Sequence, residues 1–166
     1  MDQGKINSIL NSFRDGFNSE ESGVPYDPNL TKSLQSDHEL LSASLKDIEK
    51  AIESLNFQKI EYVIKNQFKP VLVKHLITES VKLYTYLSLH IKPSSEEYPY
   101  ITKVRKKMYD IGHLTFRFTT RFSDSKLIEQ EWDEFLKQFE EVSSILSIRI
   151  DEEEHTLYSL YEKYKN

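Results

Sequence analysis

Apolar residues recur at alternating steps of three and four along most of this 166-residue chain, and this spacing constrains its fold more than any other feature. Such steps place side chains on one face of an α-helix, because a helical turn takes about 3.6 residues. The stripes cover residues 34–55, 57–83, 101–122 and 128–160. They predict four amphipathic helices, each with one face that must be buried.

The segments between these stripes are short. Asn56 alone separates the first two, residues 92–99 (KPSSEEYP) follow the second, and a turn is expected at residues 123–125. Short connections favour antiparallel neighbours. We therefore predict an all-α fold, an antiparallel up-down-up-down four-helix bundle, in which Pro70 kinks or restarts the second helix.

The first thirty residues form a separate part of the predicted organisation. Residues 19–29 (SEESGVPYDPN) collect Ser, Gly, Pro and Asp and should form a loop. We expect an amino-terminal arm and linker over residues 1–30, with a short helix at residues 5–18. The bundle should then occupy residues 31–166 as one domain, since the length suits a single core.

Composition excludes several other classes of protein. Four glycines and five prolines are too few for an all-β domain, which needs a turn roughly every ten residues. The net charge of -5 includes no long block of one sign, so no direct nucleic-acid binding is expected. The chain has no cysteine, no apolar run of about 18 residues and no secretory signal at its start. We predict a cytoplasmic protein with no membrane contact.

Five ionisable residues fall on the stripes, where apolar residues are expected: His38, His75, Glu79, Arg149 and Glu153. Such groups seldom occupy a core unless they are paired or bind a metal, because removing a lone charge from water is unfavourable. These residues are therefore the candidates for a functional site.

An internal repeat relates the second and fourth helices. The segment HLITESVKLY begins at His75, and RIDEEEHTLY begins at Arg149. In both copies the first and fifth residues lie one helical turn apart, so His75 and Glu79 share a face, as do Arg149 and Glu153. Imidazole and carboxylate groups on facing helices are typical of metal sites in bundle cores.

These segments resemble the hemerythrin-like (HHE cation-binding) family. DHELL at Asp37, HLITE at His75 and RIDEE at Arg149 are similar to the family's three ligand segments, and the resemblance covers about residues 32–164. It implies a non-haem metal centre with His38 as the ligand of the first helix. It further implies that His75 and Glu79 are the ligands of the second helix and that Glu153 is the bridging carboxylate of the fourth.

The chain departs from the family pattern in two places. Arg149 stands where the family has a histidine, and a guanidinium cannot bind a metal at neutral pH. On the third helix the repeat places Gly112 opposite His38, and His113 lies about 100° away from that line. His113 would become a ligand only if the helix were rotated. The resemblance thus implies one complete half-site for a single metal ion rather than a di-iron centre that binds O2.

A metal-free interpretation stays open beside this one. Arg149 could bridge Glu79 and Glu153 in a polar network, without a cofactor. The chain also has a weaker similarity to bacterial anti-sigma regulators of the housekeeping sigma factor, whose last helix carries a similar Arg-x-x-x-Glu. Under either interpretation Tyr84 and Tyr158 are expected to shield the site.

The sequence contains no motif for an enzyme: no cysteine, no glycine-framed serine and no glycine-rich phosphate loop. The leading prediction is a hemerythrin-like protein that binds one iron or other divalent ion and senses O2, redox state or metal. The alternative is a metal-free regulatory module, anti-sigma-like, that binds another protein or a second copy of itself.

Overall fold

The computed structural model describes Gly4, Asn7, Ser8, Asn11 and residues 23–165. Within this part every regular element is helical and no strand is present, which confirms the all-α class. Most of the predicted arm, including most of its expected helix at residues 5–18, lies outside the described residues. In the part described, no helix is both long enough and apolar enough to cross a membrane.

The helices follow the predicted stripes. The first is α2 (Leu30–Glu53). The second stripe corresponds to α3 (Phe57–Val63), α4 (Lys69–Thr78) and α5 (Thr85–His90), joined by the π-helical turns η1 (Ile64–Phe68) and η2 (Glu79–Tyr84). The third corresponds to α6 (Tyr98–Arg121). The fourth divides into α7 (Ser125–Gln130), α8 (Trp132–Glu152), the π-helical turn η3 (Glu153–Leu157) and α9 (Tyr158–Lys163).

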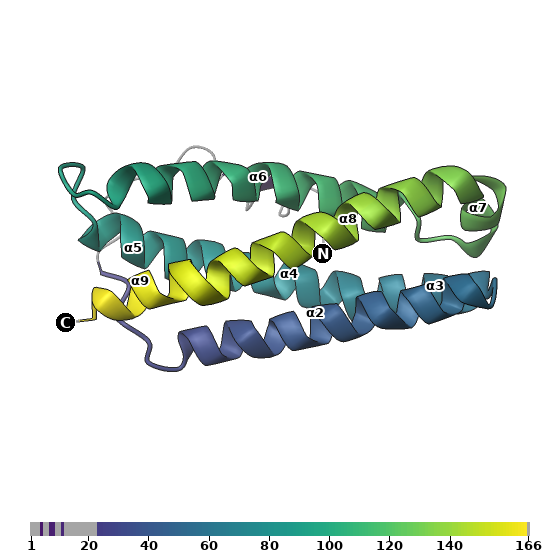
Figure 1. Ribbon diagram of the computed structural model, residues 1–166, viewed down its shortest axis with the longest axis horizontal. Coiled ribbons are helices and arrows are strands. Elements are labelled where there is room, and N and C mark those ends of the chain that lie inside the picture. Colours follow the sequence, from purple (N-terminus) through teal and green to yellow (C-terminus); the bar gives the residue numbers. More distant parts are fainter. Residues whose placement is uncertain (1–3, 5–6, 9–10, 12–22, 166) are drawn as a thin grey trace.

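The long helices lie side by side along the longest axis of the molecule (Figure 1). In this view α2 and α6 lie along the lower and upper edges, and α8 and α9 pass across the middle. α2 contacts α4 and α8, and α6 contacts the same two helices. The buried faces therefore meet in a common core along the length of the molecule.

Aromatic side chains fill the end of the core near α7. Phe118 of α6 and Phe122, the residue after α6, pack against Phe135 of α8, with ring centroids 5.8 and 5.1 Å apart. Trp132 stacks on Phe135 at 5.5 Å. These residues fall on the predicted apolar stripes. The polar cluster lies away from them, toward the middle of the helices.

Short polar side chains cap the starts of two helices, at positions where the sequence predicted connections. Asn56 Oδ1 accepts a hydrogen bond from Lys59 N at 2.9 Å, and Leu55 before it has a φ of 50°, which reverses the chain tightly. Asp124 Oδ1 accepts from Lys126 N at 2.8 Å. Such caps satisfy amide groups that have no partner within the helix.

The π-helical turns adjust the register of the helices. A π turn widens one helical turn, and such turns are frequent at functional sites. η1 precedes Pro70, which has no amide proton and would clash with the carbonyl four residues earlier in a regular helix. η2 begins at Glu79 and η3 begins at Glu153, so each candidate carboxylate is the first residue of a π turn.

Candidate metal centre

His38, on the buried face of α2, lies between two carboxylates of the last helical stretch. Its Nε2 atom is 2.9 Å from Glu153 Oε2, and its Nδ1 atom is 2.8 Å from Glu154 Oε1. Burial alone would lower the pKa of His38, but the hydrogen bonds and charges of Glu153 and Glu154 raise it above its usual value. The imidazole is therefore held in one orientation by both of its nitrogens.

His75 approaches the same carboxylate from α4. Its Nε2 atom is 3.7 Å from Glu153 Oε2 and 3.8 Å from Glu79 Oε2. Its Nδ1 atom is 4.0 Å from Asp37 Oδ2. These separations are too long for hydrogen bonds. His75 Nδ1, Glu79 Oε2 and Asp37 Oδ2 are buried atoms that have no hydrogen-bond partner.

A small cavity of about 20 Å³ lies beside the two imidazoles. Its polar lining is His38, His75, Arg149 and Glu153, and α6 closes it with the apolar side of residues that include Met108. A volume of this size holds roughly one water molecule or one small ion. The cavity cannot admit an organic substrate.

Arg149 supplies a fixed positive charge on the other side of the two carboxylates. Its Nε atom is 2.5 Å from Glu153 Oε1, and one terminal nitrogen, Nη2, is 3.4 Å from Glu79 Oε1. Nη2 also donates to Tyr84 Oη at 2.6 Å. The Nε–H bond points toward Met108 Sδ at 2.7 Å, so the short contact with Glu153 is an ion pair rather than an aligned hydrogen bond.

The two oxygens of each buried carboxylate face the same pair of side chains. In Glu79 and Glu153 alike, Oε1 faces the guanidinium of Arg149 and Oε2 faces the imidazole of His75. Burial and the neighbouring charge of Glu153 raise the pKa of Glu79 well above its usual value. Burial would also raise the pKa of Glu153, but Arg149 and the histidines lower it to below the usual range. The same environment therefore shifts the pKa values of the two carboxyl groups in opposite directions.

Two tyrosines lie against the cluster. Tyr84 is fully buried against Arg149, and Tyr158 Oη lies 3.4 Å from both Glu153 Oε2 and His38 Nε2. The ring of Tyr158 stacks on His38 with centroids 5.9 Å apart. Burial raises the pKa of both phenols, which therefore stay neutral.

His113 is not part of this cluster. Its ring packs edge-on against Tyr109, with centroids 4.5 Å apart, and it does not line the cavity. α6 presents Met108 and Thr115 there instead, as its apolar stripe indicates. Among the described residues, the ligand atoms that lie within 4.8 Å of one another come from His38, His75 and Glu153. Glu79 lies beside this group through its contact with His75.

Sequence reasoning missed two carboxylates that face the outer nitrogens of the histidines. Asp37 is 2% exposed, and its Oδ1 atom accepts from Lys74 Nζ at 2.7 Å. Glu154 Oε1 lies 2.8 Å from His38 Nδ1. Asp37 precedes His38 in the DHELL segment and Glu154 follows Glu153, so adjacency to the candidate ligands is the sequence signal for both.

The donor set fits a transition-metal ion. Two imidazole nitrogens and one carboxylate oxygen, from His38, His75 and Glu153, lie within 4.8 Å of one another, and Glu79 Oε2 lies 3.8 Å from His75 Nε2. This mixture of donors suits iron, zinc or manganese. The unpartnered Glu79 Oε2 atom is a buried acceptor that lacks a donor in the protein itself. A cation at this place would satisfy it.

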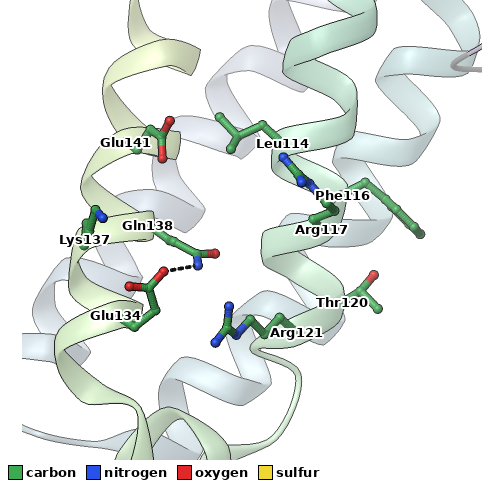
Figure 2. Close-up of a pocket in the computed structure, with 9 residues that line it drawn as sticks. All are labelled: Leu114, Phe116, Arg117, Thr120, Arg121, Glu134, Lys137, Gln138 and Glu141. Atoms are coloured by element: carbon green, nitrogen blue, oxygen red, sulfur yellow. Dashed lines mark hydrogen bonds between the residues drawn. The ribbon is translucent and has the colours of Figure 1, made fainter.

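A larger hollow on the surface is unrelated to the cluster. It has a volume of about 550 Å³ and lies between α6 and α8. Figure 2 shows side chains of both charges around it, with Gln138 hydrogen-bonded to Glu134 at 2.6 Å and Arg121 on the opposite helix. Arg121 is paired with Glu131 at 2.7 Å. The mixed, solvated lining does not define a binding chemistry.

Comparisons of the chain with protein-family models, with curated proteins and with solved structures find no match. The geometry of the buried cluster is the feature of the chain that bears on its function.

Proposed function

We propose that this chain is a hemerythrin-like protein that binds one divalent metal ion, iron by the family resemblance. The ligands are His38, His75, Glu79 and Glu153. The proposal includes the finer architecture: the stretches formed by α2, by α3 to α5, by α6 and by α7 to α9 make an antiparallel up-down-up-down four-helix bundle. His113 is left out of the ligand set.

One observation carries the proposal. Both buried histidines turn Nε2 toward the same oxygen, Glu153 Oε2, while a second carboxylate faces each Nδ1 atom. Those carboxylates are Glu154 for His38 and Asp37 for His75. Histidine ligands commonly donate their other ring N–H to a carboxylate, which fixes the tautomer and orients the ligand nitrogen. Glu154 fills this role at His38, and Asp37 lies on the corresponding side of His75, 4.0 Å from Nδ1 and without a hydrogen bond.

The charge of the cluster also favours a cation. In the described part of the chain, Arg149 is the one guanidinium that faces the two buried carboxylates, and burial raises the pKa of Glu79, so a further cation would favour its ionised form. Metal binding to such a site releases protons from its ligands. The proposed ion would therefore compete with protons at Glu79 and at His38 Nε2.

The small cavity restricts what the centre can do. A ferrous ion with nitrogen and oxygen ligands can change oxidation state or bind a small gas molecule. The space of about 20 Å³ excludes larger substrates. We therefore propose a sensing role, for O2, redox state or metal, and no enzymatic turnover.

Calorimetric titration of metal-free protein tests this proposal. Fe(II) without oxygen, Zn(II) and Mn(II) are titrated separately into wild type, His75→Ala and His155→Ala. His155 is the matched control, because its side chain is 75% exposed and bonds only within its own helix. We expect about one ion bound per chain in wild type and His155→Ala, and none in His75→Ala. No binding of any of the three ions to wild type would refute the proposal.

A metal-free regulatory module remains the second candidate, because Arg149 alone connects Glu79, Glu153 and Tyr84. Such a network needs no cofactor and links the second helical stretch to the fourth. In that case metal has no effect on the melting temperature, and the partner is another protein or a second copy of the chain.

A further inference from the structure

Tyr158 begins α9, directly after the π turn η3, and lies against the candidate metal centre. Its ring plane is only 9° from that of His38, with ring centroids 5.9 Å apart. Its Oη atom lies 3.4 Å from His38 Nε2 and 3.4 Å from Glu153 Oε2. The phenol therefore places an oxygen beside two atoms that are proposed to bind the ion.

Both contacts of the phenol oxygen are long for hydrogen bonds. An O–H···O bond is usually about 2.7–2.8 Å long, and an N–H···O bond about 2.9–3.0 Å. Tyr158 is 4% exposed, and a buried hydroxyl group usually makes a hydrogen bond of ordinary length. The position of Tyr158 Oη therefore fits another kind of interaction better than it fits these two hydrogen bonds.

The same separations match those between two ligands of one metal ion. Nitrogen and oxygen ligands lie about 2.0–2.2 Å from a zinc ion, so two of them are about 2.8–3.6 Å apart for bond angles between octahedral and tetrahedral. Tyr158 Oη, His38 Nε2 and Glu153 Oε2 form a triangle with edges of 2.9, 3.4 and 3.4 Å. The three atoms can therefore bind one ion with little movement of their side chains.

We infer that Tyr158 is a further ligand of the proposed ion and that it makes the centre hold iron as Fe(III). The inference rests on the proposed function, because it needs an ion at His38 and Glu153. On binding, the phenol oxygen forms a bond to the ion and its proton passes to solvent, as ligand protons do in metal sites. Burial raises the pKa of this phenol in the metal-free protein, and a cation beside it opposes that effect.

The preference for Fe(III) follows from charge. A phenolate adds a full negative charge to the ligand set, and an anion attracts a trivalent ion more strongly than a divalent one. The effect is large in a site as buried as this one, because little solvent screens the charges. Reversible O2 binding needs Fe(II), so a centre that holds Fe(III) responds to redox state rather than to O2.

Iron loading of the full chain tests this inference. Metal-free wild type, Tyr158→Phe and Tyr161→Phe are incubated with Fe(III) nitrilotriacetate and desalted, and iron content and visible absorption are recorded. Tyr161 is the matched control, because it is buried on the same helix and its hydroxyl contacts Asp27 instead of the cluster. We expect a visible charge-transfer band from phenolate to Fe(III) in wild type and Tyr161→Phe, and its loss in Tyr158→Phe.

Two further measurements separate a ligand from a structural role. Resonance Raman spectra of wild type, excited in this band, should show phenolate ring vibrations, and this result does not depend on the folding of a variant. The Fe(III)/Fe(II) reduction potential should be higher in Tyr158→Phe than in wild type and unchanged in Tyr161→Phe.

The outcomes distinguish this inference from the proposed function. Wild type that binds iron without the band, or an equal band in Tyr158→Phe, would overturn the inference and leave the metal site standing. Wild type that binds Fe(II) or Zn(II) but no Fe(III) would also overturn it. Protein that binds none of these ions would overturn the proposed function as well.

Discussion

Arg149 Nε lies 2.5 Å from Glu153 Oε1, although both side chains are almost fully buried. The other oxygen of the same carboxylate lies 2.9 Å from His38 Nε2. Glu153 thus connects a permanent cation on its own helix to an imidazole on α2. The proposed ion would share Glu153 with Arg149, much as two metal ions share a bridging carboxylate.

Removal of Arg149 should destabilise the fold strongly. Arg149→Ala leaves Glu153 and Glu79 without their buried cation, and breaking a buried pair on one side typically costs about 3 kcal/mol or more. Arg121→Ala removes an exposed pair with Glu131 and should cost below about 1 kcal/mol. Urea unfolding of both variants measures the difference. Equal, small effects would contradict the network described here.

Arg149→His should restore a ligand rather than simply remove a charge. If the guanidinium occupies the place of a second metal ion, the histidine variant should bind more metal than wild type when iron is supplied. The measurement is metal bound per chain after desalting, with Arg149→Ala as the control for loss of charge. An Arg149→His variant that binds no more metal than Arg149→Ala would argue against that interpretation.

The carboxylates that face the Nδ1 atoms of the histidines should affect metal affinity without binding the metal themselves. Glu154→Gln keeps the size of the side chain but removes the charge that faces His38 Nδ1, and such changes typically weaken metal binding by about 10- to 100-fold. Glu140→Gln, at an exposed position of α8, is the control. The dissociation constant of each variant is measured by titration. Equal constants for the two variants would mean that Glu154 has no such role.

Glu61 should make the fold sensitive to acid. Lys65 and the Ser125 amide lower the pKa of Glu61 from 4.5 to about 2, and the bond to Ser125 links α3 to the start of α7. Because the folded pKa is below the unfolded one, this stabilisation is complete above pH 4.5 and is lost as the pH falls toward 2. Glu61→Gln should therefore be less stable than wild type at pH 7, by about 1 kcal/mol, and the gap should narrow at pH 3. A gap independent of pH would show that the charge is irrelevant.

The fold class was predictable because helical periodicity is a local property of the sequence. The connection at Asn56 and the third helix at residues 101–122 agree with the cap at Lys59 and with α6. The break at Glu131 between α7 and α8 was not predicted, since the apolar stripe continues across it. The π turns at Glu79 and Glu153 were also missed, because widening one turn leaves the stripe nearly unchanged.

The candidate site was predictable only in its inner part. His38, His75, Glu79, Arg149 and Glu153 stand out because charge on an apolar face is unusual, and the structure brings all five together. Asp37 and Glu154 were missed, because their positions beside the histidines depend on how neighbouring helices pack rather than on their own spacing. Helix packing also keeps His113 out of the site, because the apolar contacts of α6 set the rotation of that helix.

Elemental analysis of freshly purified, tag-free protein tests most directly whether this chain holds a metal ion. The metal content of wild type is compared with that of His75→Ala, both prepared without chelator. We predict close to one iron or other divalent ion per wild-type chain and almost none in the variant. Metal-free wild-type protein, or equal metal content in both proteins, would contradict the proposal.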